Sequence, residues 1–96
     1  MYSLHRIKNK KYLEWVRTLP CVITGDHIVE AHHLIGYGQS GMGLKASDWY
    51  AFPLSPLLHR ELHDCGWKKW EEKYGCQWRF VAQTMHQAAQ EGILLS

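Results

Sequence analysis

Two pairs of histidines constrain the fold of this chain more than any other feature of its sequence. His32 and His33 are adjacent in EAHHL, whereas His59 and His63 are separated by four positions in LLHRELH. Four positions span about one turn of an α-helix, so His59 and His63 share one face of any helix that forms here. Neutral imidazole binds transition metals and moves protons near neutral pH. A fold that places the adjacent pair beside this helix face would assemble a site for one metal ion.

The length of the chain favours a single domain, residues 1–96, in which such a site would also stabilise the fold. A chain of 96 residues buries only about 60–65% of the surface that it exposes when unfolded. A bound metal would therefore contribute folding free energy as well as chemistry. The three cysteines are odd in number and form no CxxC pair, so we interpret each as a small buried hydrophobe: Cys21, Cys65 and Cys76.

Positive charge is concentrated at the start of the chain, although the net charge is only +2. One acidic residue, Glu14, opposes the basic residues of this segment, which are His5, Arg6, Lys8, Lys10, Lys11 and Arg17. Such a segment raises the local affinity for phosphate groups. The alternative interpretation of the segment is an ordinary helix face exposed to solvent. The sequence has no apolar run of about 18 residues and no signal-peptide core, so we expect a soluble intracellular protein without membrane contact.

Local signals give the order helix, two strands joined by a long loop, and then further helices. Helices are expected where apolar residues recur at helical spacing or where capping residues mark the ends, and strands where β-prone residues cluster. The expected helices are 8–19, 55–66, 67–74 and 77–91, and the expected strands are 27–34 and 49–54. The last helix is expected to bury Trp78, Val81, Ala82, Met85 and Ala89.

The segment GYGQSGMGLKASD, residues 36–48, contains four of the eight glycines of the chain. It is too polar for a core element, so we expect a long exposed loop, and such loops in small domains usually carry function. These features together predict an α+β fold with a small ββα-metal core, in which a β-hairpin with a long Gly-rich loop precedes a metal-binding helix. The core covers residues 20–66, between a basic N-terminal helix in residues 1–19 and C-terminal helices in residues 67–96.

A hairpin that leads into a helix with two histidines has the outline of a ββα-metal nuclease site. Hydrolysis of a phosphodiester needs an activated water, a Lewis acid on the phosphate and stabilisation of the leaving oxygen. Three imidazoles, from His32, His59 and His63, would hold the metal and leave one coordination position open. His33 would then act as the general base. The residues alone leave open which of the adjacent histidines is the ligand and which is the base.

The adjacent histidines also raise a geometric requirement. Neighbouring residues on a regular strand point to opposite faces, so both rings reach one cleft only at a β-bulge or at the end of the strand. The other ring nitrogen of a general base must be held, either by Asp48 or by a backbone carbonyl. The alternative for Asp48 is a carboxylate that stabilises a turn. Glu61, on the predicted metal helix, is a candidate outer partner for a metal-bound histidine.

Several polar side chains near these histidines are candidates for contacts with nucleic acid. Lys45 and Ser47 follow the glycines of the loop, and Arg60 lies on the exposed side of the predicted metal helix. Lys8 and Lys11 belong to the basic N-terminal segment. Positive and hydrogen-bonding groups of this kind contact the phosphates of a bound nucleic acid. The alternative for each is a solvated surface residue.

The motifs of this sequence, taken together, resemble those of a known family. The runs EAHHL, GYGQSGMGLKASDWYAFPLSPLLHRELH and WEEKYG, over roughly residues 20–75, are similar to the phage and prophage HNH (His-Me finger) nucleases of the recombination-enhancement type. The resemblance implies a single-metal DNA endonuclease, with His33 as base and with His32, His59 and His63 around the metal. It also implies a phage or prophage origin, a role in DNA recombination or processing, and a location in the cytoplasm of a bacterial host cell.

The sequence departs from the pattern of that family in two places. Relatives often carry PLCRxHH where this chain has PLSPLLH, so Ser55 replaces a cysteine and Leu58 replaces a histidine. Many HNH proteins also have CxxC pairs, whereas the run from Cys21 to Thr24 has one sulfur, so we expect no second, structural zinc. We expect the long basic arm of larger relatives to be either missing or reduced to residues 5–17.

The sequence therefore leads to two hypotheses of different kinds. The first is a metal-dependent DNA endonuclease of the HNH type, with one divalent ion, Zn²⁺ in a crystal and Mg²⁺ or Mn²⁺ for activity. Its partner is DNA, with a recombinase filament as a further candidate, and a toxin-like nuclease controlled by another protein would share the same site. The alternative is a non-catalytic, zinc-stabilised module that binds DNA or a recombinase. Neither hypothesis specifies an oligomeric state.

Overall fold

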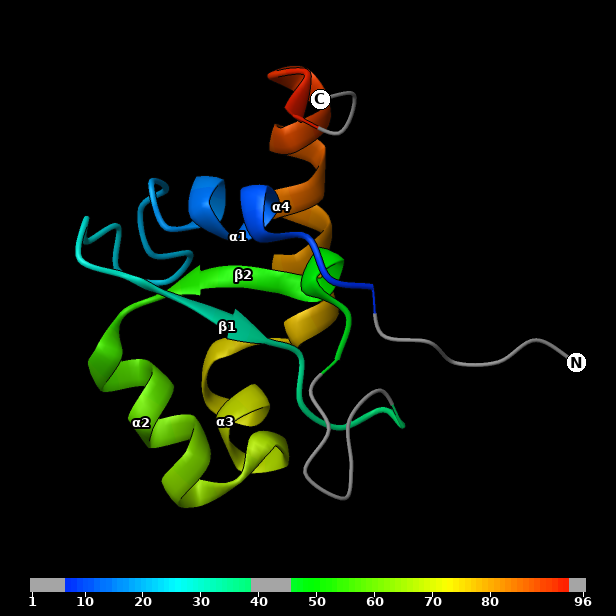
Figure 1. Ribbon diagram of the computed structural model, residues 1–96. Coiled ribbons are helices and arrows are strands. Elements are labelled where there is room, and N and C mark those ends of the chain that lie inside the picture. Colours follow the sequence, from blue (N-terminus) through cyan, green and yellow to red (C-terminus); the bar gives the residue numbers. More distant parts are fainter. Residues whose placement is uncertain (1–6, 39–45, 94–96) are drawn as a thin grey trace, which may run out of the picture.

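A two-stranded antiparallel hairpin lies between helices that cover its two faces (Figure 1). Strand β1 spans Glu30–His33 and strand β2 spans Ala51–Leu54. The computed structural model describes residues 7–38 and 46–93. Within these ranges the predicted α+β class is confirmed, because helices and an antiparallel strand pair are packed around shared clusters of buried side chains.

The helices in the described part of the chain lie close to the predicted ranges. They are α1 (Lys10–Val16), the 3₁₀ helix η1 (Asp48–Tyr50), α2 (Pro56–Cys65), α3 (Trp67–Tyr74) and α4 (Gln77–Gln90). Helix α1 begins later than predicted because the side chain of Asn9 caps it and accepts a hydrogen bond from the N–H of Tyr12. Helix η1 replaces the start of the predicted strand 49–54, since the hydroxyl of Ser47 accepts a hydrogen bond from the N–H of Trp49.

The pairing of β1 with β2 is regular and decides which side chains share a face. The paired residues are Glu30 with Leu54, Ala31 with Pro53, His32 with Phe52 and His33 with Ala51. Every residue of one strand has a single partner, so the bulge that was one way to bring both histidines into a cleft is wrong. Strand periodicity instead sends His32 and His33 to opposite faces. His33 is the last residue of β1, at the point where the pairing ends.

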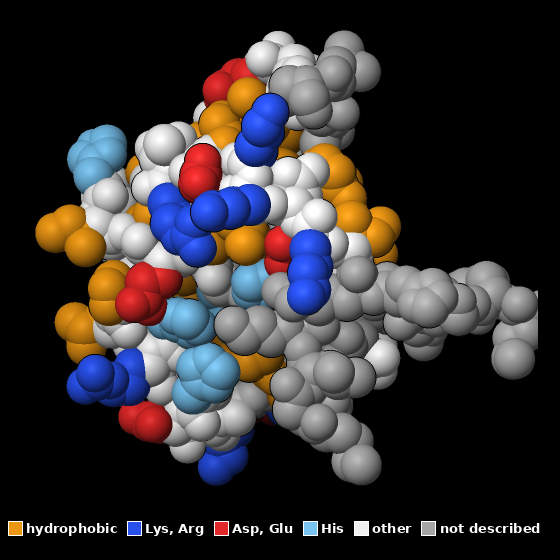
Figure 2. Space-filling view, in the orientation of Figure 1, with side chains coloured by type: hydrophobic (Ala, Val, Ile, Leu, Met, Phe, Trp, Pro, Cys, Tyr) orange, Lys and Arg blue, Asp and Glu red, His pale blue; other side chains and the backbone are white. Residues whose placement is uncertain are grey.

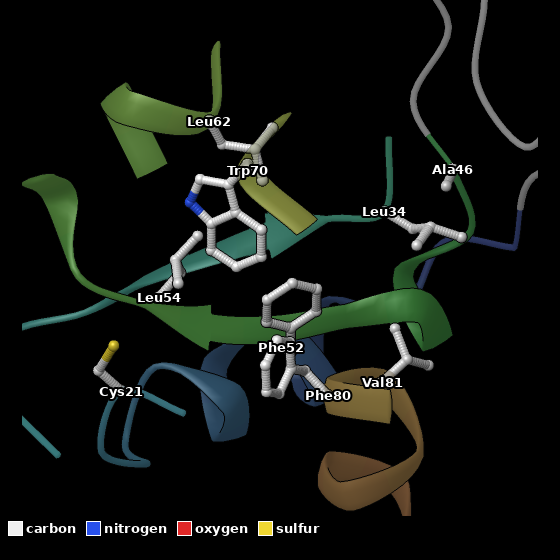
Figure 3. Close-up of a cluster of buried hydrophobic side chains, with 9 residues drawn as sticks. All are labelled: Cys21, Leu34, Ala46, Phe52, Leu54, Leu62, Trp70, Phe80 and Val81. Carbon is white, nitrogen blue, oxygen red and sulfur yellow. The ribbon is translucent and has the colours of Figure 1, made fainter. Parts of the chain in front are cut away.

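The face of the hairpin that carries His32 packs against α2, α3 and the first half of α4. Its core is formed by nine buried residues (Figure 3): Cys21, Leu34, Ala46, Phe52, Leu54, Leu62, Trp70, Phe80 and Val81. Trp70 is fully buried and its indole N–H donates to the carbonyl oxygen of Leu58 at 3.2 Å, which ties α3 to α2. Each large apolar side chain buried in this way stabilises the fold by about 1.5–3 kcal/mol. This cluster holds α2 against β1.

The opposite face of the hairpin packs against α1 and the second half of α4. Tyr12 and Val16 of α1 meet Ala88 of α4 in a second buried cluster, and Ala31 of β1 packs against it. Helix α4 therefore contributes to both clusters, and its buried residues are Gln77, Phe80, Val81, Thr84 and Ala88. The predicted apolar stripe is wrong for Ala82 and Ala89, which are exposed. Polar Gln77 and Thr84 take part in the buried face because hydrogen bonds satisfy them.

Two further expectations need correction. Cys21 is buried, but Cys65 and Cys76 are exposed, so only the first cysteine acts as a buried hydrophobe. The end of the predicted exposed loop is also buried, at Ala46 and Asp48, because Ala46 joins the main core cluster and Asp48 begins η1. The part of the chain that the structure describes has no helix of sufficient length and hydropathy to cross a membrane.

Candidate metal centre

The start of α2 determines where two of the four histidines point. The hydroxyl of Ser55 accepts a hydrogen bond from the N–H of Leu58 at 3.4 Å, and Pro56 occupies the first turn, as predicted. Buried Leu62 then turns one side of the helix to the core. With the phase of the helix fixed, His59 and His63 lie one turn apart beside β1.

Three of the predicted site residues come together at this place. The ring centroid of His59 lies 4.8 Å from that of His32 and 4.9 Å from that of His63. One ring nitrogen from each of the three histidines lies within 4.8 Å of the others. Nitrogens at about 2.1 Å from a tetrahedral zinc are about 3.4 Å apart, so the spacing in the cluster is of the order that one ion requires. The three-histidine cluster is therefore a candidate site for one ion.

The three-histidine cluster is buried at one end and open at the other. His32 is 1% exposed, His59 is half-buried and His63 is exposed. Histidine side chains accordingly appear on the surface of the molecule in the space-filling view (Figure 2). An ion held here would be reached by solvent from the side of His63, as a catalytic metal site requires.

His32 supplies a direct test of whether a metal fits. Its Nε2 lies 3.0 Å from Oε1 of Gln77, whereas its Nδ1 is buried and has no hydrogen-bond partner among the described residues. An unpartnered buried polar atom costs about 1–3 kcal/mol, so such an atom calls for a specific explanation. Burial, with a smaller contribution from the neighbouring His59 and His63, lowers the pKa of His32 to about 3. The ring is therefore neutral, which is the form that binds a metal.

His59 has a carboxylate partner that the sequence did not reveal. Its Nδ1 lies 2.7 Å from Oε1 of Glu30, which precedes His32 by two residues on β1 and therefore shares its face. The predicted outer partner, Glu61, is wrong in this role. Its carboxylate instead accepts hydrogen bonds from Lys73 and from the hydroxyl of Tyr74. The period of two on a strand is the signal that could have identified Glu30.

His33 lies on the other face of the hairpin and meets the predicted carboxylate. Its Nε2 is 2.8 Å from Oδ1 of Asp48, and both side chains are largely buried, with 12% and 4% exposed. The other oxygen of Asp48 accepts a hydrogen bond from the backbone N–H of Asn9 at 2.7 Å. The predicted contact between His33 and Asp48 is thus present, although it forms in a buried 3₁₀ helix rather than in an exposed loop. The catalytic role of the pair stays a prediction.

The predicted contacts with nucleic acid are distributed unevenly. Arg60, Lys8 and Lys11 are exposed, and Figure 2 shows Lys and Arg side chains gathered over α1, on the side of the hairpin away from α2. The hydroxyl of Ser47 caps η1 and donates to the carbonyl oxygen of Ile7 at 3.4 Å, so it is engaged with the backbone. Lys45 lies outside the described residues.

Comparison with known proteins finds a family but no activity. The family model described as "Protein of unknown function (DUF968)" matches residues 3–92. The chain is also 41% identical over 85 residues to a protein of Escherichia coli (strain K12) named "Uncharacterized protein YdfU". This match covers 88% of the chain and 24% of the relative, so the chain spans about a quarter of the length of that curated protein. No solved structure matches the chain.

Proposed function

The chain belongs to the DUF968 family of proteins of unknown function, and we propose that it is a metal-dependent DNA endonuclease of the HNH (His-Me finger) type. One observation carries the proposal. The three-histidine cluster and the His33–Asp48 pair meet at the same strand, β1, one on each of its faces. Because His33 is the last residue of β1, the end of the strand is the remaining way for both rings to approach one phosphate, and the ligand set for one ion lies next to a carboxylate-held histidine there. Phosphodiester hydrolysis needs both groups.

The donor set favours a transition metal. Three imidazoles, with an Nδ1 on His32 that has no partner in the described part of the chain, suit Zn²⁺ better than Mg²⁺, which prefers oxygen ligands. Such an ion, when bound, would act as a Lewis acid on the scissile phosphate and stabilise the leaving oxygen. His32, His59 and His63 would hold it from β1 and α2.

The His33–Asp48 pair is arranged to accept a proton from water. Asp48 is an acceptor toward Nε2 of His33, so that nitrogen carries the hydrogen and Nδ1 keeps its lone pair. A water that donates to this Nδ1 would lose its proton to the ring as it attacks the phosphorus. The adjacent carboxylate would stabilise the imidazolium that forms. The hydrogen bond from the N–H of Asn9 keeps Asp48 in place during this transfer.

DNA is the proposed substrate because positive charge lies beside the site. Lys8 and Lys11 are exposed at the start of α1, next to the segment that binds Asp48, and Arg60 is exposed on α2. Cations of this kind neutralise phosphates and orient a bound strand. A role in phage or prophage recombination, with a recombinase filament as a further partner, belongs to the same proposal and rests on the family resemblance of the sequence.

Cleavage of plasmid DNA tests the proposal. We expect the purified chain to nick or cut a plasmid in the presence of a divalent metal, and H33A to reduce the rate by about 10²–10⁴-fold, the usual contribution of a general base. H86A is the matched control, because His86 is an exposed histidine on α4. Undiminished cleavage by H33A would reject the assignment of the base.

A non-catalytic zinc module is the second candidate. It is favoured by the depth of His32, which is packed edge-on against Phe52 in the core with ring centroids 5.0 Å apart. A metal bound there would stabilise the fold directly. The two candidates differ in the number of protein ligands, since a structural zinc has four. Among the described residues the cluster offers three, which favours the enzyme.

A further inference from the structure

Gln77, at the first position of α4, is the most constrained polar side chain next to the candidate metal centre. It is fully buried. Its Oε1 accepts a hydrogen bond from the N–H of Ile35 at 3.1 Å, and its Nε2 donates to the carbonyl oxygen of the same residue at 2.9 Å. Because Ile35 offers one donor and one acceptor, only one orientation of the amide satisfies both. Rotation of the amide by half a turn would place its N–H group against the N–H of Ile35 and its oxygen against the carbonyl oxygen of Ile35.

This fixed amide determines which nitrogen of His32 carries the hydrogen. Oε1 of Gln77 is only an acceptor, so Nε2 of His32, at 3.0 Å, must be the donor. A neutral imidazole has one hydrogen, which leaves the lone pair on Nδ1. That atom is the buried nitrogen of His32 without a hydrogen-bond partner among the described residues. Gln77 therefore leaves Nδ1 as the nitrogen of His32 that is able to bind a metal.

Glu30 makes the complementary choice at His59. Its carboxylate accepts a hydrogen bond from Nδ1 of His59 at 2.7 Å, so this ring carries its hydrogen on Nδ1 and its lone pair on Nε2. The two neighbouring rings are thus held in opposite tautomers by two different partners.

We propose that Gln77 and Glu30 are positioning residues for the metal, which set His32 to bind through Nδ1 and His59 to bind through Nε2. The inference rests on the metal-binding part of the proposed function. Outer partners of this kind fix the orientation and tautomer of a ligand, and their loss costs about 10–100-fold in metal affinity.

The support for His32 extends beyond the hairpin and the metal helix. One carboxylate oxygen of Glu71, on α3, accepts hydrogen bonds from the backbone N–H of Gln77 at 2.9 Å and from its side-chain Nε2 at 3.3 Å. The other oxygen accepts from the hydroxyl of Tyr37, in the segment after β1. The C-terminal helices therefore take part in the metal centre, which the sequence placed within residues 20–66.

Two measurements test the inference. Long-range ¹H–¹⁵N NMR of the metal-free chain reports the tautomer of each imidazole, and competition with a chromophoric chelator gives the affinity for Zn²⁺. In the native chain we expect hydrogen on Nε2 of His32 and on Nδ1 of His59. Q77M keeps the length of the side chain but loses the amide, and we expect it to mix the tautomers of His32 and lower Zn²⁺ affinity about 10–100-fold.

The controls separate positioning from folding. T84V on the same helix removes a buried hydrogen bond, from the hydroxyl of Thr84 to the carbonyl oxygen of Phe80, at a distance from the histidines, and it should leave Zn²⁺ affinity unchanged. The Glu30 side chain is 53% exposed, so E30A should fold even if Q77M does not. We expect about 10-fold weaker Zn²⁺ binding in E30A and recovery in E30Q, which keeps an acceptor oxygen.

The outcomes distinguish this inference from the proposed function. A native chain that binds Zn²⁺ with hydrogen on Nδ1 of His32, or native affinity in both Q77M and E30A, would overturn the inference alone. A native chain that shows the expected tautomers but binds no Zn²⁺ would instead remove the metal site of the proposed function.

Discussion

The two faces of β1 give adjacent histidines different environments. His32 lies in the main core, with the amide of Gln77 on one nitrogen and two other imidazole rings nearby. His33 lies on the side of α1, with a carboxylate on one nitrogen. Burial lowers the pKa of His32 and keeps its ring neutral, whereas the ring of His33 lies against the carboxylate of Asp48. The comparison shows that strand alternation alone can give neighbouring identical residues different partners.

The largest expected effect comes from the partner of His33. In D48N, the amide can donate to the ring, so Nε2 of His33 loses its hydrogen and Nδ1 gains it. We expect the rate of DNA cleavage to fall by about 10³–10⁴-fold, as when the orienting carboxylate of a catalytic histidine is replaced. Zn²⁺ affinity should stay native, since Asp48 lies on the other face. A plasmid-nicking rate close to native would show that Asp48 only stabilises the turn.

The next largest effect is the stabilisation of the fold by Zn²⁺, which should depend on the histidines of one face of β1 and not on His33. Addition of Zn²⁺ at 100 times its dissociation constant should raise the free energy of unfolding by about 2.7 kcal/mol in the native chain. H33A should show the same increase, whereas H63A, which removes an exposed ligand, should show almost none. Urea unfolding with and without Zn²⁺ measures both. Equal stabilisation of H63A and the native chain would exclude His63 as a ligand.

The pH dependence of the metal-free chain reports on His32. Burial lowers the pKa of His32 to about 3 in the folded chain. Between that pH and the unfolded pKa of about 6.5, the unfolded chain binds a proton that the folded chain does not. The contribution of His32 to the free energy of unfolding is therefore fully present above the unfolded pKa of about 6.5. It is lost as the pH falls toward 3, by at most about 1.4 kcal/mol per pH unit.

Urea unfolding in the presence of a metal chelator, between pH 7.5 and 5, should show this loss. In H32L, the free energy of unfolding should fall less steeply as the pH falls. The same slope in both chains would assign the acid sensitivity to other groups.

The smallest effects concern the path of DNA. Lys8 and Lys11 lie on the side of His33, whereas Arg60 lies on the helix of the metal ligands. Each phosphate contact that is removed should lower the slope of log affinity against log salt by about one. We expect this change in K8A and K11A, measured by fluorescence anisotropy with a labelled duplex, and a smaller one in R60A. K69A, which changes an exposed lysine on α3, is the control. A larger effect of R60A would place the DNA across α2.

Local chemistry explains what the sequence could predict. Ser55 and Pro56 mark the start of α2, and Gly66 and Gly75 end α2 and α3 where the backbone takes positive φ values of 91° and 119°. The spacing of His59 and His63 needs only this helix, so their proximity follows from the sequence. The contact of His33 with Asp48 was also predicted, from the need to hold the second nitrogen of a base.

The missed residues depend on contacts between distant segments. Gln77 reaches His32 across 45 positions, and its burial was not expected because the stripe of α4 was predicted from apolar residues alone. Glu30 reaches His59 across 29 positions. Neither pairing has a local signal, since each depends on how α4 and α2 pack against the hairpin. Of the two ways to bring both rings to one cleft, the bulge is wrong and the end of the strand remains, because His33 is the last residue of β1.

The place of Gln77 in the chain has a consequence for the order in which the protein matures during synthesis. All three histidines of the cluster have been added once residue 63 is incorporated, but the amide that sets His32 follows fourteen positions later, at the start of α4. Until α4 docks on the hairpin, His32 is free to exchange between its tautomers. A nascent chain should therefore capture zinc weakly until α4 has folded and tightly only after that.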